Sequence, residues 1–139
     1  MAEDFEITCG KIKKENDKLL VKFRSHLVEI GLVNKTIKSH IDNLDLFSDY
    51  LTYYEPYRGL SQSESTDVHD FLDDWFIRKA LWASPSAVKA YISTFKKFFK
   101  WLNMENLVPD EEYQDLLGLI KEEKEAWIEG AEINEEDCW

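Results

Sequence analysis

The segment that decides the fold is SPSAVKAYISTFKKFFKWL, residues 84–102. Ser84 is a candidate helix N-cap, and Pro85 follows at the first helical position, where the missing proline N–H costs nothing. Behind this start, apolar side chains recur every three or four residues and form one stripe, made of Val88, Tyr91, Ile92, Phe95, Phe98, Phe99 and Leu102. The spacing predicts an amphipathic helix with one buried face.

The same periodicity precedes this segment. A first helix is predicted over residues 19–30, with Gly31 as its stop and a start that reaches back toward Lys11; its stripe is Leu20, Phe23, Leu27 and Ile30. A second helix is predicted over residues 35–54, with Asn34 as N-cap; its stripe is Ile37, Ile41, Leu44, Phe47 and Leu51. A third is predicted over residues 67–80, with Thr66 as N-cap; its stripe is Val68, Phe71, Leu72, Trp75 and Phe76.

The chain beyond residue 104 predicts one more helix. It covers residues 110–128, and its stripe is Tyr113, Leu116, Leu117, Ile120 and Trp127. Beyond Gly130 the sequence is highly charged and weakly periodic, so we expect a frayed or disordered end. Because no segment alternates as a strand does, the predicted fold class is all-α, a compact bundle of four helices plus a fifth C-terminal helix.

Length and composition set the class of protein. The 139 residues fit one domain, and 5 Gly with 3 Pro are too few for the turns of a large sheet. The chain lacks an apolar run of membrane-spanning length and the features of a signal peptide, so we expect a cytoplasmic protein without a membrane partner. Cys9 and Cys138 lie near opposite ends with no ligand-like spacing, which predicts free thiols.

The distribution of charge is more informative than its sum. A net charge of −11 argues against nucleic acid, because phosphate binding depends on Lys and Arg. However, residues 11–41 carry +5, residues 84–104 carry +4 with no acidic residue, and residues 105–139 hold 13 acidic side chains against 2 basic ones. The chain therefore has two cationic segments and an anionic end.

The helix that begins at Pro85 is predicted over residues 85–103, and it carries a basic face. Opposite its apolar stripe lie Ser86, Lys89, Ser93, Lys96, Lys97 and Lys100. A solvated lysine face is one interpretation. A solvated face usually mixes signs, because Glu–Lys pairs one turn apart support a helix, yet this face has no acidic residue in a chain that holds 28. The exclusion of acid favours an anionic partner.

The second helix carries a shorter basic face in its first turns. There the unpaired N–H groups and the helix dipole attract phosphate. The side chains at these turns are Asn34, Lys35, Thr36, Lys38 and Ser39, a set typical of phosphate contacts, although Asn34 and Thr36 are equally explained as capping residues. Upstream lies a third basic patch, made of Lys11, Lys14, Lys18 and Lys22. Two interpretations of this patch stay open, a solvated surface and a surface that faces DNA.

No pattern in the chain indicates catalysis, and we expect no cofactor and no metal. Glycine-rich phosphate loops, GxSxG and HExxH are absent from the sequence. The three histidines, His26, His40 and His69, fall on separate predicted helices, which favours ordinary boundary positions over metal ligands. The neighbouring acids Asp73-Asp74 and Glu122-Glu123 point in different directions around a helix, which suits solvated charge rather than acid–base catalysis. The aromatic run from Phe95 to Trp101 predicts core rather than a base-stacking platform.

Four segments carry a resemblance to a known family. They are residues 23–32, 34–51, 68–75 and 84–102, with Thr36-Ile, Phe47-Ser-Asp-Tyr-Leu51 and Phe98-Phe-Lys-Trp-Leu102 among their motifs. Together they resemble the amino-terminal core-binding, SAM-like domain of tyrosine recombinases, the phage integrase family. The resemblance covers a core-binding domain at residues 18–104. The rest of the sequence is interpreted as an N-terminal arm at 1–17, a C-terminal helix at 105–129 and an acidic tail at 130–139.

The resemblance also implies a function. In that family the domain closes one side of a C-shaped clamp on duplex DNA through its second and fourth helices, for DNA recombination and integration. The implied DNA-binding positions are Lys35, Thr36, Lys38 and Ser39 on one helix, and Ser86, Lys89, Ser93, Lys96, Lys97 and Lys100 on the other. The charge distribution selects the same two helices independently.

The implied partners are double-stranded DNA and a catalytic recombinase domain or other recombinase subunits. The family's catalytic residues lie on a separate carboxy-terminal domain, and residues 105–139 are too few and too acidic to form it, so we expect no enzymatic activity from this chain alone. Two origins stay open, a fragment lacking its catalytic half and a free-standing relative with a modulating tail. A different class also stays open, an acidic helical protein–protein interaction or regulatory module that no longer binds DNA.

Overall fold

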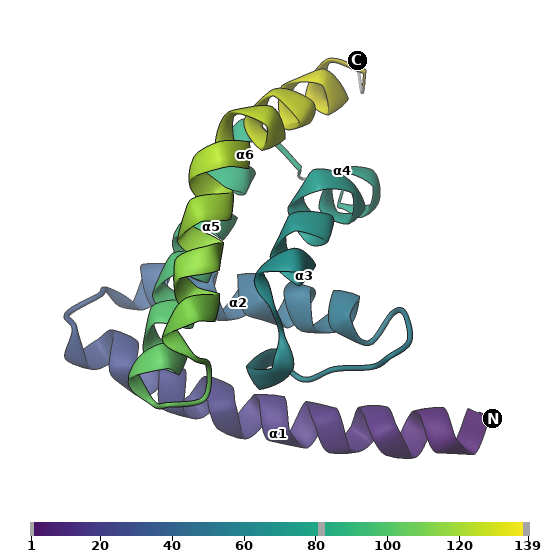
Figure 1. Ribbon diagram of the computed structural model, residues 1–139, viewed down its shortest axis with the longest axis vertical. Coiled ribbons are helices and arrows are strands. Elements are labelled where there is room, and N and C mark those ends of the chain that lie inside the picture. The colour runs from purple at the N-terminus through teal and green to yellow at the C-terminus, as the bar shows by residue number, and fades with distance from the viewer. Residues whose placement is uncertain (1, 81–82, 138–139) are drawn as a thin grey trace. The chain divides into compact units, whose positions relative to one another are not determined.

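The computed structural model describes residues 2–80 and 83–137 (Figure 1). Every regular element in these residues is a helix, which confirms the all-α fold class. The chain divides into two units, Met1–Ser63 and Glu64–Trp139. Over the described ranges, none of the helices combines the length and the apolar character that crossing a bilayer requires.

Unit 1 consists of α1 (Ala2–Glu29), α2 (Asn34–Leu51) and the short 3-10 helix η1 (Leu60–Gln62). Helices α1 and α2 lie side by side after a tight turn at Gly31, whose φ is 86° (Figure 1). The Gly31 N–H donates to Val28 O at 3.0 Å, and the Leu32 N–H donates to Leu27 O at 3.1 Å. This bond pair is a Schellman motif, so the prediction that Gly31 stops the first helix is confirmed.

Helix α1 begins far earlier than the expected start near Lys11. Its first turns are held by the segment that follows α2: the ring of Phe5 packs edge-on against Tyr57 at 5.0 Å between centroids. About three turns further along the same helix, Asn16 Oδ1 accepts a buried hydrogen bond of 2.9 Å from the Leu60 N–H. Both contacts join residues more than 40 positions apart, so local periodicity does not reveal them.

Helix α2 starts and ends differently from the prediction. Its N-cap is Val33 in extended conformation, with φ −76° and ψ 156°, so Asn34 is the first helical residue and the prediction of Asn34 as N-cap is wrong. The helix ends at Leu51 rather than residue 54. The predicted stripes of unit 1 are buried at Leu20, Phe23, Leu27, Ile37, Leu44, Phe47 and Leu51. Ile30 departs from its stripe and is 51 % exposed, because it follows the end of α1.

Unit 2 opens with a helical stretch that changes its hydrogen-bonding period. It is made of α3 (Ser65–Asp70), the π-helix η2 (Phe71–Trp75) and α4 (Phe76–Lys79). The predicted cap at Thr66 is wrong, since Glu64 is the N-cap and its N–H donates to the Asp67 carboxylate at 2.9 Å. In η2 the Phe76 N–H reaches back five residues to Phe71 O. This wider turn places four large side chains in the core, namely Phe71, Leu72, Trp75 and Phe76.

Helix α5 (Pro85–Met104) agrees with its prediction at every position of the apolar stripe. The Ser84 Oγ accepts from the Ala87 N–H at 3.1 Å, which confirms the N-cap. Phe71 contacts two rings of α5, Tyr91 at 5.5 Å and Phe95 at 6.0 Å between centroids. Phe98, Phe99 and Trp101 are also buried, so the aromatic run is core, as predicted.

Helix α6 (Asp110–Asp137) packs along α5 and runs in the opposite direction (Figure 1). It continues past residue 128, so the prediction of a frayed or disordered end is wrong for residues 131–137; residues 138–139 lie outside the described part. Trp127 and Ala131 are both buried, one turn apart, across Gly130. Ala and Glu are strong helix formers, and the anchored turn extends the helix despite the glycine.

Candidate nucleic-acid interface

The basic face of α5 is exposed opposite the buried stripe. Ser86, Lys89, Lys96 and Lys100 are exposed, while Ser93 and Lys97 are half-buried. The helix forms this way because its apolar residues are fixed in the core by the Ser84 cap and the aromatic packing, which turns the remaining positions outward. All six predicted α5 residues therefore share one surface.

The lysines of this surface have few partners among the described residues. Within the residues that the structure describes, Lys89, Lys96 and Lys100 take part in no salt bridge. Lys97 is oriented by a neighbour one turn away, because its Nζ donates to Ser93 Oγ at 3.1 Å. The serine hydroxyl does not remove the lysine charge, so α5 presents four positive groups with no acidic residue in the helix.

The basic face of α2 occupies the first turns of that helix. Lys35, Thr36, Lys38 and Ser39 are all exposed. Lys38 Nζ pairs with Asp42 Oδ2 at 2.7 Å, and the two side chains are 74 % and 57 % exposed. An exposed pair of this kind contributes about 1 kcal/mol or less and exchanges readily for another anion. Lys35 is therefore the more available cation of the two.

The ten predicted residues form two groups. Four lie on α2 in unit 1, and six lie on α5 in unit 2. Each group is continuous on its own helix and gathers lysines with hydroxyl side chains. Lysine, serine and threonine are typical phosphate contacts in protein–DNA complexes.

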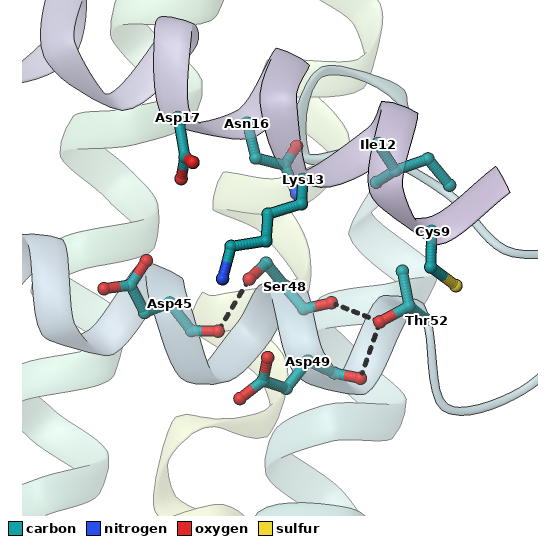
Figure 2. Close-up of a pocket in the computed structure, with 9 residues that line it drawn as sticks. All are labelled: Cys9, Ile12, Lys13, Asn16, Asp17, Asp45, Ser48, Asp49 and Thr52. Atoms are coloured by element: carbon teal, nitrogen blue, oxygen red, sulfur yellow. Dashed lines mark hydrogen bonds between the residues drawn. The ribbon is translucent and has the colours of Figure 1, made fainter. Parts of the chain in front are cut away.

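The other half of α2 has the opposite charge. A pocket of about 530 Å³ lies between α1 and α2 (Figure 2), lined by Cys9, Ile12, Lys13, Asn16, Asp17, Asp45, Ser48, Asp49 and Thr52. Partial burial, together with the charges of Asp42, Asp49 and Asp17, raises the pKa of the Asp45 carboxyl; Lys13 acts against this rise. Such a pocket repels phosphate, so the basic surface of α2 is confined to its N-terminal turns.

The side chain of Lys13 extends from α1 toward Asp45 and Ser48 on α2 (Figure 2). Sequence reasoning grouped other lysines of α1, namely Lys11, Lys14, Lys18 and Lys22, which are all exposed. The sequence did not indicate that Lys13 lowers the pKa of Asp45, because only the packing of α1 on α2 brings Lys13 near that carboxyl. Cys9 at the same pocket is a free thiol, as predicted, whereas Cys138 lies outside the described residues.

Comparison with known proteins gives one match. A family model described as phage integrase, N-terminal SAM-like domain, matches residues 20–106, which is more than half of the chain and includes the whole of α2 and α5. The comparisons with curated proteins and with solved structures found no significant match. The matched family is defined by the N-terminal domain of integrases, not by their catalytic domain, and it indicates a recombinase-related DNA-binding module. On this match, and on the helical bundle that carries it, the chain belongs to the family of phage integrase N-terminal SAM-like domains.

Proposed function

We propose that this chain binds duplex DNA through the basic faces of α2 and α5 and forms one arm of a recombinase clamp. The observation that carries the proposal is the face of α5, where Lys89, Lys96 and Lys100 are exposed and take part in no salt bridge among the described residues. Uncompensated cations on one face of a helix suit a polyanion, since each lysine that meets a phosphate releases a condensed counterion.

The chemistry of the two faces favours contact with phosphates over reading of bases. The α5 face offers lysines and serines, and it lacks the Arg, Asn and Gln that make bidentate contacts with base edges. The Ser93–Lys97 hydrogen bond of 3.1 Å holds one ammonium group close to the helix surface, which lowers the entropy cost of placing it on a phosphate. The module therefore binds duplex DNA with little sequence preference.

The acidity of the chain is compatible with this function because the charges are segregated. Two of the three acids of α2, Asp45 and Asp49, line the pocket formed with α1, and α5 contains no acidic residue. At physiological salt, exposed charges more than about 8 Å apart are largely screened from each other. Affinity for DNA then depends on local contacts rather than on the net charge of −11.

In this function the chain supplies binding, and strand exchange belongs to a partner. The matched family implies DNA and recombinase partners in general. We propose that a catalytic recombinase domain or another recombinase subunit acts together with this module. The module alone is expected to bind DNA without cleaving it.

The test is fluorescence anisotropy of a labelled duplex over a series of salt concentrations. The variant replaces Lys89, Lys96 and Lys100 by alanine. Each lost phosphate contact reduces the magnitude of the slope of log K against log salt by about 0.9. The triple variant should therefore reduce that magnitude by up to about 2.7. Binding should weaken to a similar degree for duplexes of unrelated sequence.

A matched control removes lysines from outside the proposed surface. Lys121→Ala with Lys124→Ala, both on α6, should leave the salt slope within error of the parent value. Circular dichroism establishes that each variant is folded. If the folded triple variant binds duplex DNA as the parent does, with the same slope, DNA binding through α5 is refuted and the acidic interaction module becomes the better description.

A further inference from the structure

Three potential metal ligands from different helical segments meet in unit 2. One ligand atom each from His69, Asp73 and Glu123 lies within 4.8 Å of the others. His69 and Asp73 are one turn apart across the junction of α3 and η2, and Glu123 comes from α6, which packs against both segments. The pairing depends on that packing, since the two segments are 50 residues apart in the sequence.

The imidazole of His69 is held from two sides. Its Nδ1 lies 3.2 Å from Asp70 Oδ1, and its ring lies edge-on to the buried Trp127, with centroids 6.1 Å apart. Metal-binding histidines usually donate one ring N–H to a carboxylate, which fixes the tautomer and leaves the other nitrogen to coordinate. In a site of this kind Asp70 would take the outer position on Nδ1, which would leave Nε2 to coordinate.

The two carboxylates of the cluster are not neutralised. Of the neighbouring acids Asp73 and Asp74, Asp74 is engaged by Arg78, whose Nε and Nη2 donate at 2.9 and 2.8 Å. Within the described part of the chain, Asp73 and Glu123 form no salt bridge. Two anionic groups and an imidazole thus lie together, and no Lys or Arg of the described residues is paired with either carboxylate; a divalent cation would offset their repulsion.

We propose that His69, Asp73 and Glu123 bind a divalent transition metal of the zinc class. Zinc takes imidazole nitrogen and carboxylate oxygen at about 2.0–2.2 Å, which places two ligands of a tetrahedral ion about 3.3 Å apart. The ligand atoms lie within 4.8 Å of one another, so the half-buried Glu123 and the exposed Asp73 would rotate their side chains to reach that separation. The imidazole favours zinc over magnesium or calcium, which prefer oxygen-only sites.

Bound metal would tie the α3–η2 segment to α6. Three protein ligands leave a fourth position for water, and the site lies on α3, η2 and α6, separate from the α5 lysines in the sequence. Metal bound only by the folded state raises the melting temperature. The role we assign is therefore a stabilising one, in which the bound metal holds two helical segments of unit 2 together.

Isothermal titration of ZnCl₂ into the chelator-treated full chain tests this site. Cys9→Ser and Cys138→Ser in the background remove thiol binding. We expect one equivalent of zinc, no comparable binding of MgCl₂, and a loss of affinity of at least tenfold in Asp73→Asn and in Glu123→Gln. Asp70→Asn should weaken binding about tenfold, as outer partners of metal ligands do. Glu125→Gln, an exposed neighbour on the same helix, should bind as the parent does.

A second measurement needs no variant. Titration of the parent chain with Co²⁺ should broaden or shift the amide NMR signals of residues 69–73 and 120–127 first. The proposal is overturned if the parent shows no saturable zinc binding, if Asp73→Asn and Glu123→Gln bind zinc as tightly as the parent, or if Co²⁺ acts first on the acidic pocket at residues 45–49. DNA binding through α5 is tested separately, and its failure would leave the metal site unaffected.

Discussion

Asn16 and Leu60 are 44 residues apart and are joined by a buried hydrogen bond of 2.9 Å from the Leu60 N–H to the Asn16 Oδ1. Asn16 is only 7 % exposed, so its amide has left water to make this contact. Gly59 lies beside it, and a Cβ at that position would stand 3.3 Å from the same oxygen. The bond therefore fixes η1 against α1 within unit 1.

Asn16→Ala should lower the free energy of unfolding by about 1–3 kcal/mol, because it leaves the buried Leu60 N–H without an acceptor. Urea titration followed by circular dichroism measures the change. Ser25→Ala is the control, since its hydroxyl makes an exposed bond of 3.2 Å to Val21 O within the same helix. Equal stabilities of the two variants would contradict the importance assigned to Asn16.

Phe95→Ala should destabilise the protein by about 3–5 kcal/mol, the usual range for truncating a fully buried phenylalanine. Phe95 is 0 % exposed and contacts the rings of Phe71 and Tyr91. Met104→Ala, at a position that is 57 % exposed, should change stability by less than about 0.5 kcal/mol. Thermal melting of both variants checks the difference, and a parent-like melting temperature for Phe95→Ala would show that α5 packs through another face.

Asp45→Asn should stabilise the protein at neutral pH. Partial burial and the neighbouring carboxylates of Asp42, Asp49 and Asp17 raise the pKa of Asp45 above its ordinary value of 3.8. A raised pKa in the folded state means that this group favours folding below the ordinary pKa and loses that contribution as pH rises through the folded value. The gain from Asp45→Asn should therefore be present at pH 7 and vanish near pH 3.

Urea unfolding at the two pH values measures this dependence. Asp115→Asn, an exposed carboxyl on α6, serves as the control. A stability difference between Asp45→Asn and the parent that is the same at pH 3 and pH 7 would rule out the electrostatic origin. Lys13→Met should shift stability at pH 7 in the opposite direction, because Lys13 lowers the pKa of Asp45.

Removal of residues 133–139 should leave the affinity for duplex DNA equal or raise it at low salt. The deleted segment contains three acidic residues and no basic one, so its loss removes only repulsion. The cut falls after Glu132 because Ala131 is buried, and an earlier stop would disturb the packing of α6. Anisotropy and melting temperature are measured together; a tenfold loss of affinity at unchanged stability would show that this segment contacts DNA.

The parts of the fold that local sequence determines were predictable. The Ser84 cap, the Gly31 stop and the stripe of α5 each depend on residues within a few turns of one another. The early start of α1 involves contacts with residues more than 40 positions away, and the π-helix η2 has a wider hydrogen-bonding period, so a period of 3.6 residues could indicate neither. The last turns of α6 could not be predicted from composition, because high charge is common to disordered ends and to exposed helices.

The candidate site likewise has a part that local sequence predicts and a part that depends on packing between distant segments. The α5 lysines were predictable because an amphipathic helix with a known buried face leaves only one exposed face. The pairing of Lys38 with Asp42 was also readable from their spacing of four, but the prediction counted only the lysine. The cluster at His69, Asp73 and Glu123 was not predictable, since α6 meets α3 only in the folded unit.

Helix α5 has two distinct faces, with Phe95 and its stripe in the core and Lys96 beside it at the surface. Substitutions on the two faces therefore have separable consequences. In a saturation mutagenesis of α5, we expect two sets of sensitive positions. Substitutions in one set should prevent folding, and substitutions in the other should weaken only DNA binding. Each set should recur with the helical period, and the two sets should lie on opposite faces of the helix. If the proposed function holds, substitutions of the lysines would change the affinity for DNA without destabilising the helical bundle.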